Sequence, residues 1–148
     1  MKRTLAAVLA LAAAGAVATT GFASSTKRSG SLHVTKECGD YHGAAGEFCT
    51  ITSSNIPAIK RGMTVLYASA ADFTAGVLDS DLVIDGPGQN AAFGHVVLDL
   101  STFTGVVTLS GGTGRFSHFH AGPLAVACPA FPACSWDGTY GFSPPGDD

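Results

Sequence analysis

Apolar and polar residues alternate along most of the chain, in short runs separated by glycine- and proline-rich turns. A period of two places successive side chains on opposite faces of a β-strand, and regularly spaced runs of this kind are typical of sandwiches and barrels. Eight such strands can close into a barrel, which leaves no exposed sheet edge. We therefore expect an all-β protein, an eight-stranded antiparallel β-barrel. Its strands are predicted at 48–53, 63–69, 76–85, 92–100, 105–110, 115–120, 123–128 and 135–142.

The same alternation predicts which side chains face the interior. In the strand at 76–85, the even-numbered positions are mostly apolar, whereas the odd-numbered ones include Asp79, Asp81 and Asp85. In the last strand, large aromatic side chains share one face that must be covered. In a small barrel the core is also the wall of any cavity. The candidate ligand-binding residues, for a small apolar molecule, are therefore Leu78, Ser80, Leu82, Ile84, Trp136, Tyr140 and Phe142.

Some outward positions are apolar too, among them Val77, Val83, Phe93 and Val97. Two interpretations stay open for these residues. They could seat a second copy of the chain in a homo-oligomer, or they could be the scattered apolar surface residues that monomers also carry.

The N-terminal segment has the parts of a secretory signal peptide. Lys2 and Arg3 supply positive charge, residues 5–18 form an apolar run, and small residues end the segment near Ala23. The run is shorter than the roughly 20 apolar residues that span a bilayer. We expect a secreted protein with no membrane contact after cleavage. The expected segments are a signal peptide at 1–23, a loosely ordered polar arm at 24–37, the barrel at 38–142 and a disordered tail at 143–148.

The chain has four cysteines, all beyond the predicted signal peptide. An even count in an oxidising compartment argues for disulfides. Of the three pairings, we expect Cys38–Cys49 and Cys128–Cys134, because each encloses a short loop that contains glycine or proline; neither spacing is that of a zinc knuckle. If the strands at 48–53 and 135–142 close the barrel as neighbours, Cys49 and Cys134 lie at opposite ends.

Charge excludes one class of partner and gives little support to metal binding. The formal net charge of −3 becomes about −5 without the signal peptide, and the remaining cations are scattered, so we expect no nucleic-acid partner.

His118 and His120 would share one face of a strand, with His95 as a third candidate metal ligand if the strands converge. We favour histidines at a barrel rim that hydrogen-bond to backbone or water over a metal site, and the Asp79–Asp81 pair fits an outer face as well as a calcium site. We expect no metal and no cofactor.

Several segments together resemble the allene oxide cyclase and dirigent barrel superfamily. They are Phe93–Leu100, Thr104–Phe116 and Phe119–Gly122, and the motif that carries the resemblance is Gly-Gly-Thr-Gly-Arg-Phe at 111–116. The segments at 48–55 and 136–140 are similar to a bacterial secreted group within it whose function is unsettled. The resemblance covers about residues 38–142 and implies an eight-stranded barrel, with the glycines at a tight hairpin between two strands.

The activities of that superfamily do not transfer residue by residue. Its plant cyclases use a glutamate near the barrel mouth, and the glutamates here, Glu37 and Glu47, precede the first predicted strand. Dirigent proteins use aspartates in the pocket, whereas Asp79 and Asp81 fall on the outward face. Ser53, with the polar residues that follow it, lacks the nucleophile-elbow pattern and is interpreted as turn capping. The catalytic residues are therefore unknown.

The predicted function follows from the lack of a recognisable set of acid, base and nucleophile on the strands. We expect a non-catalytic binding or structural role outside the cell, with a small apolar ligand inside the barrel. One alternative is a cyclase- or dirigent-type enzyme that acts on an apolar or phenolic compound. The other is a structural secreted oligomer. The first two need space inside the barrel, whereas the last needs a filled barrel and an apolar outer surface.

Overall fold

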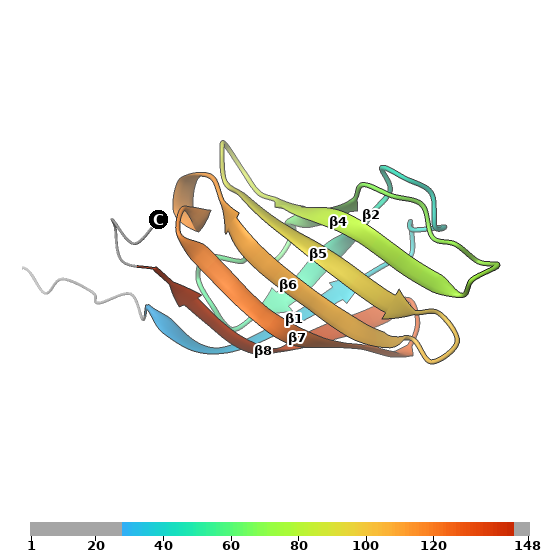
Figure 1. The fold of residues 1–148 in the computed structure, drawn as a ribbon. Helices are drawn as coiled ribbons and strands as arrows, with labels where there is room; N and C mark the ends of the chain where they lie inside the picture. Colours follow the sequence, from blue (N-terminus) through green and yellow to red (C-terminus); the bar gives the residue numbers. More distant parts are fainter. Residues whose placement is uncertain (1–27, 144–148) are drawn as a thin grey trace, which may run out of the picture.

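The computed structural model describes residues 28–143, which form a closed antiparallel β-barrel (Figure 1). The strands follow one another around the barrel in sequence order, and β8 pairs with β1 to close it. Residues 1–27 and 144–148, with the predicted signal peptide and most of the predicted tail, lie outside the described residues. The strands are β1 Ser29–Glu37, β2 Phe48–Ser54, β3 Thr64–Tyr67, β4 Val77–Asp85, β5 Ala91–Asp99, β6 Thr104–Gly112, β7 Phe119–Ala130 and β8 Ala133–Phe142.

The predicted fold class and the predicted faces of the strands are confirmed. In β4, Leu78, Leu82 and Ile84 point inward and are at most 2% exposed, while Asp79 and Asp81 are exposed. The alternation determines these faces because a strand in a closed barrel has one covered side and one solvated side.

The predicted polar arm is wrong from Ser29 onward, because this segment is strand β1. It pairs with both β2 and β8, and the barrel therefore begins at Ser29 rather than at Cys38. The segment alternates, with Leu32 and Val34 inward and fully buried. Its third inward position is Lys36, which breaks the apolar pattern and makes the strand look like a polar arm in the sequence.

The predicted strand at 115–120 is also wrong. A short 3-10 helix, η1 Gly114–Phe116, follows β6, and the chain turns before β7 begins. Gly114 and His118 have positive φ angles, which interrupt an extended strand. From Phe119, β7 continues past Pro123, where the pairing register with β8 shifts, so the predicted strand at 123–128 is part of this longer strand.

The loops of the barrel gather at its two ends (Figure 1). Because neighbouring strands are antiparallel, the loops that follow β1, β3, β5 and β7 lie at one end, which we call the disulfide end. The opposite, terminal end holds the loops that follow β2, β4 and β6. Arg28 and Phe142 also lie there, and the Phe142 amide donates to the Arg28 carbonyl at 2.7 Å.

Candidate functional site

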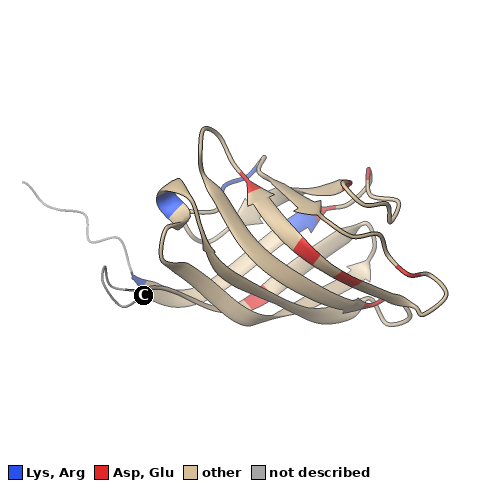
Figure 2. Cartoon of the chain, turned by 45° about the horizontal axis from the view of Figure 1, so that its top comes forward, with Lys and Arg blue, Asp and Glu red and all other residues tan. Residues whose placement is uncertain are grey.

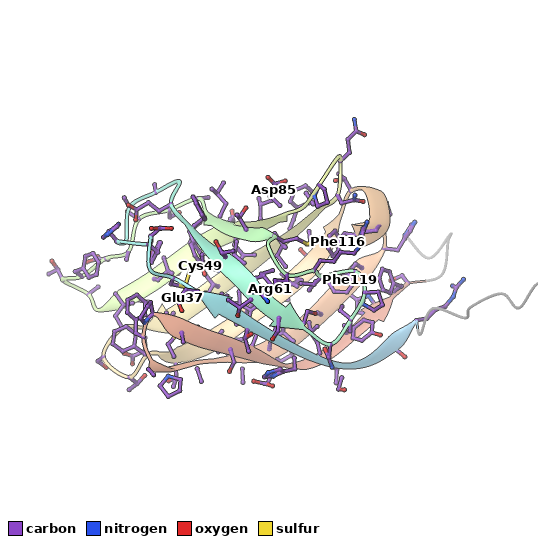
Figure 3. All side chains as sticks on the ribbon, turned by 180° about the vertical axis from the view of Figure 1, so that it is seen from behind. Glu37, Cys49, Arg61, Asp85, Phe116 and Phe119 are labelled. Carbon is purple, nitrogen blue, oxygen red and sulfur yellow. A yellow bond between two sulfur atoms is a disulfide. The ribbon has the colours of Figure 1, made fainter. Side chains whose placement is uncertain are left out.

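The two disulfides lie at the same end of the barrel, on the loops after β1 and β7. The predicted pairs, Cys38–Cys49 and Cys128–Cys134, are confirmed, and the Cys38 amide donates to the Pro132 carbonyl at 3.0 Å. Figure 3 shows Glu37 and Cys49 near this end, with Phe116 and Phe119 towards the other. The expectation that Cys49 and Cys134 lie at opposite ends is wrong. It treated β2 and β8 as direct neighbours, whereas β1 stands between them and reverses the direction.

Lys36 is the only lysine or arginine with a buried side chain within residues 28–143, and it points into the barrel just below the disulfide end. Its Nζ donates to the hydroxyl oxygen of Tyr67 at 2.5 Å and lies 3.6 Å from the sulfur atoms of Cys38 and Cys49. It also lies over the rings of Tyr67 and Trp136, at 5.2 and 5.3 Å from their centroids. No carboxylate forms an ion pair with it within the described residues.

This environment changes the proton affinity of both groups. Burial in the apolar interior lowers the pKa of Lys36 from its usual 10.5 to about 7. Burial raises the pKa of the Tyr67 hydroxyl, which therefore stays a neutral phenol at neutral pH. The interior of this end thus holds a lysine that is partly an uncharged amine near neutral pH, next to a phenol.

Two further polar atoms at this end are buried without a hydrogen-bond partner among the described residues, the Tyr41 hydroxyl and the Trp136 Nε1. Tyr41 comes from the loop between β1 and β2 and packs on Tyr67, with ring centroids 5.0 Å apart. The disulfide-linked loop therefore covers the interior cluster, which gathers an amine, phenols and an indole N–H.

Exposed phenylalanines surround the same end of the barrel. Phe73, Phe103 and Phe131 lie on the loops after β3, β5 and β7, and their residues are 71%, 36% and 48% exposed. Exposed apolar side chains that gather in one region mark contact surfaces, and aromatic residues are enriched at such surfaces. The sequence analysis missed these residues and Lys36, because loop phenylalanines do not alternate and an inward lysine has no sequence signal of its own.

The loops hold these rings in defined positions. Asp72 Oδ1 accepts from the amides of Thr74 and Ala75, and the Ala71 amide donates to the Gly43 carbonyl. Phe73 packs so closely on Gly43 that a Cβ there would lie 2.5 Å from its ring. The loop between β1 and β2 therefore supports the loop that carries Phe73.

Phe103 and Phe131 form a second aromatic group, which the Cys128–Cys134 disulfide supports. The ring centroids of Phe103 and Phe131 lie 5.5 Å apart. The Cys128 amide donates to the Phe103 carbonyl at 2.9 Å, and the Cys128–Cys134 bond closes the turn that carries Phe131. The loop of Phe103 and the turn of Phe131 are thus both held by Cys128, through its backbone amide and its disulfide respectively.

The predicted ligand-binding residues face the interior of the barrel or pack against it, but they are spread along its length: Leu78 and Trp136 lie towards the disulfide end and Phe142 at the terminal end. Side chains that line an open cavity are partly exposed to the space inside it. The side chains here are only 0–2% exposed, namely Leu78, Ser80, Leu82, Ile84 and Trp136. Tyr140 is 8% exposed, and Phe142 is partly buried near Phe119. Apolar packing therefore fills this part of the interior, and ligand binding by these residues stays a prediction.

The predicted candidate metal ligands are not brought together. His95 points outward from β5 and contacts Asp81 through Nδ1 at 2.9 Å and Asp79 through Nε2 at 3.0 Å. His118 and His120 flank the start of β7 at the terminal end. Within residues 28–143, no group of three or more His, Cys, Asp or Glu side chains is arranged to hold a metal ion.

The other candidate positions have structural roles. Ser54, the last residue of β2, caps the turn that follows, since its Oγ accepts from the Ile56 amide, while Asn55 Oδ1 accepts from the His33 amide of β1. Glu47 accepts from the amides of His42 and Ala44, which lowers its pKa and organises the loop between β1 and β2. Glu37 is exposed at the end of β1.

Comparisons with known proteins give no relative. No family model, curated protein or solved structure matches the chain. Within residues 28–143, no helix is long and apolar enough to cross a membrane. The resemblance to the allene oxide cyclase and dirigent superfamily stays a prediction.

Proposed function

We propose that the protein is an extracellular, non-catalytic binding protein that contacts its partner with the disulfide end of the barrel. The observation that carries this proposal is the exposure of Phe73, Phe103 and Phe131 on loops that disulfides and hydrogen bonds support. Rigid aromatic side chains supply large contact area at little conformational cost. The disulfides fit an oxidising compartment such as the cell exterior.

An apolar ligand is proposed at the loop tips rather than in the interior. The side chains predicted to line an internal site are packed against one another, so a ligand there would have to displace them. The exposed rings need no such rearrangement. The barrel then acts as a rigid scaffold for its loops, a common division of roles between scaffold and loops.

The experiment measures binding of a neutral apolar fluorophore, N-phenyl-1-naphthylamine, to the purified protein. We expect saturable binding that is lost in a variant with Phe73→Ser, Phe103→Asn and Phe131→Ser. Asn is chosen at position 103 because it tolerates the positive φ of Phe103. The changed side chains are exposed, so the variant should keep the melting temperature of the parent to within a few degrees.

Phe93→Ser is the matched control, because Phe93 is 44% exposed but lies on the barrel wall in β5. It should bind the fluorophore as the parent does. Equal binding by the triple variant and the parent would refute the loop tips as the binding surface and would favour a ligand site in the barrel interior.

One observation favours a second candidate function, an enzyme. Lys36 is an amine with a pKa of about 7 beside the Tyr67 hydroxyl, and a buried amine of this kind can accept a proton or attack a carbonyl carbon. Such an enzyme would need a path for its substrate past Tyr41, which covers the cluster.

Reductive methylation of the folded protein with formaldehyde, followed by peptide mass mapping, separates the two functions. If small carbonyl compounds do not reach the interior, the exposed Lys60 is modified and Lys36 is not, which agrees with the non-catalytic proposal. Modification of Lys36 at a rate similar to that of Lys60 would support the enzyme.

A further inference from the structure

Charge is unevenly distributed over the barrel, as Figure 2 shows. The disulfide end carries acidic side chains on its loops and strand ends, and its lysine, Lys36, is buried. The exposed lysine and arginine side chains of residues 28–143 lie towards the terminal end. The acidic residues of the disulfide end are Glu37, Asp40, Glu47, Asp72 and Asp99, and the exposed cations are Arg28, Lys60, Arg61 and Arg115. The exposed Asp85, at the end of β4, also lies at the terminal end, near Lys60 and Arg61.

Apart from Glu47, which pairs with His42, these charges form no ion pair inside the described part of the molecule. Within residues 28–143, every ion pair between side chains involves a histidine, so Lys60, Arg61 and Arg115 pair with no carboxylate. On the acidic side, Asp72 and Asp99 accept hydrogen bonds from loop amides and stay exposed. Both sets of charges are therefore available to a partner.

The loop between β2 and β3 forms a shallow, open hollow of about 530 Å³ beside Lys60 and Arg61. Its lining is mixed: residues 52–55 are polar, Pro57 is exposed, and Ile56 and Ile59 are 6% and 1% exposed. Arg115 Nη1 donates to the Pro57 carbonyl at 3.5 Å, which brings a third cation to this loop. We call this region the basic surface.

We propose that the partner of the disulfide end is the basic surface of a second copy of this chain, so that copies associate head to tail. This inference rests on the proposed function, because it takes the disulfide end as the binding surface. Phe73, exposed beside Asp72, would enter this hollow while the acidic residues around it face Lys60, Arg61 and Arg115. Shape and charge then favour the same arrangement.

Charge disfavours the symmetric arrangement. A two-fold dimer through the disulfide ends would bring Asp40, Asp72 and Asp99 of both copies together, and like charges at an interface oppose association. A head-to-tail contact instead leaves one disulfide end and one basic surface free at the ends of each assembly. Association therefore continues beyond the dimer or closes into a ring.

The test uses two variants, each blocked at one surface. Phe73→Ser with Phe131→Ser blocks the disulfide end, and Lys60→Glu with Arg61→Glu blocks the basic surface. In sedimentation equilibrium from about 10 µM to about 1 mM, we expect the mass of the parent to rise with concentration past the dimer. Each blocked variant alone should stay monomeric, and their equimolar mixture should form dimers and nothing larger, because each supplies the surface that the other lacks.

Salt and a control variant complete the test. The association of the parent should weaken at 0.5 M NaCl, because screening reduces the attraction between exposed charges. Phe93→Ser should associate as the parent does, since Phe93 lies on neither surface. Circular dichroism and melting temperature show that each variant is folded.

Two results would overturn the inference. One is a parent that stays monomeric up to about 1 mM, and the other is a mixture of the blocked variants that gives no dimer while the parent associates. In either case, fluorophore binding by the parent and its loss in the triple phenylalanine variant would still support the disulfide end as a binding surface. Failure of the inference is thus separate from failure of the proposed function.

Discussion

The Nζ of Lys36 and the hydroxyl oxygen of Tyr67 lie 2.5 Å apart inside the barrel, and no carboxylate within the described residues pairs with the lysine. The pair joins β1 to β3 across the interior, beneath the loop that the Cys38–Cys49 bond closes. A buried lysine whose partners are a phenol, two aromatic faces and two sulfur atoms is strongly desolvated. It therefore makes the stability of the barrel depend on pH.

Lys36→Met should raise the free energy of unfolding at pH 7 by about 3 kcal/mol. The pKa of Lys36 is about 7 in the folded state and about 10.5 in the unfolded state, so burial opposes folding by up to about 5 kcal/mol wherever both states would be protonated. Loss of the Tyr67 hydrogen bond and of the contacts with the aromatic rings offsets part of that gain. Urea unfolding at pH 7 measures the difference, and Lys60→Met, at an exposed position, is the control.

The pH dependence of unfolding provides a separate test of Lys36. Between about pH 7 and pH 10.5, the unfolded chain holds a proton that the folded protein has released, so stability should rise with pH through this window and level off below it. Measurements up to about pH 9 stay about one unit below the usual pKa of tyrosine, so Tyr67 is still largely protonated in the unfolded state. The slope should disappear in Lys36→Met, and a slope of equal size there would contradict the assignment.

Gly112→Val should destabilise the barrel by roughly 2–4 kcal/mol. The cause is crowding rather than a positive φ: a Cβ at Gly112 would lie 2.0 Å from the Ala91 carbonyl oxygen and 2.7 Å from Phe116 Cβ. Thermal unfolding measures the loss. Gly111→Asn is the matched control, because Gly111 has a positive φ of 95° that Asn tolerates and open space around it, so its melting temperature should change little.

Replacing both Cys128 and Cys134 with Ser should lower the free energy of unfolding by about 2 kcal/mol, the chain-entropy value for so short a loop. The change should also weaken fluorophore binding, because this bond closes the turn that carries Phe131. Urea unfolding and the fluorophore titration measure the two effects. Reducing the parent with a soluble thiol would break both disulfides, so the double variant is the cleaner comparison.

Asp81→Asn should lower the pKa of His95. The hydrogen bond that His95 Nδ1 donates to the Asp81 carboxylate, with a further contribution from Asp79, raises the pKa of this imidazole. Titration of the imidazole proton signals by NMR measures it. Asp137→Asn is the control, because Asp137 contacts His33 and should leave His95 unchanged. An unchanged His95 pKa in Asp81→Asn would mean that the contact between β4 and β5 is not formed in solution.

The fold class, the faces of most strands and the disulfide pairing could be predicted from the pattern of residues along the chain. In β4, strict alternation decides that Leu82 is buried and Asp81 exposed, because one strand face is always covered in a barrel. The short loops between paired cysteines favour Cys38–Cys49 and Cys128–Cys134 without knowledge of any distant contact. These properties are local, so a local pattern is enough to predict them.

Tertiary structure decided the rest. The segment that holds Lys36 becomes a strand because β2 and β8 supply hydrogen-bond partners on both sides, and this closure carries a lysine into the interior despite the desolvation it suffers. Closure also places both disulfides at one end, beside the exposed Phe73 and Phe131 and away from Lys60 and Arg61. Such relationships join residues that are far apart in the chain, and no periodicity along a single strand encodes them.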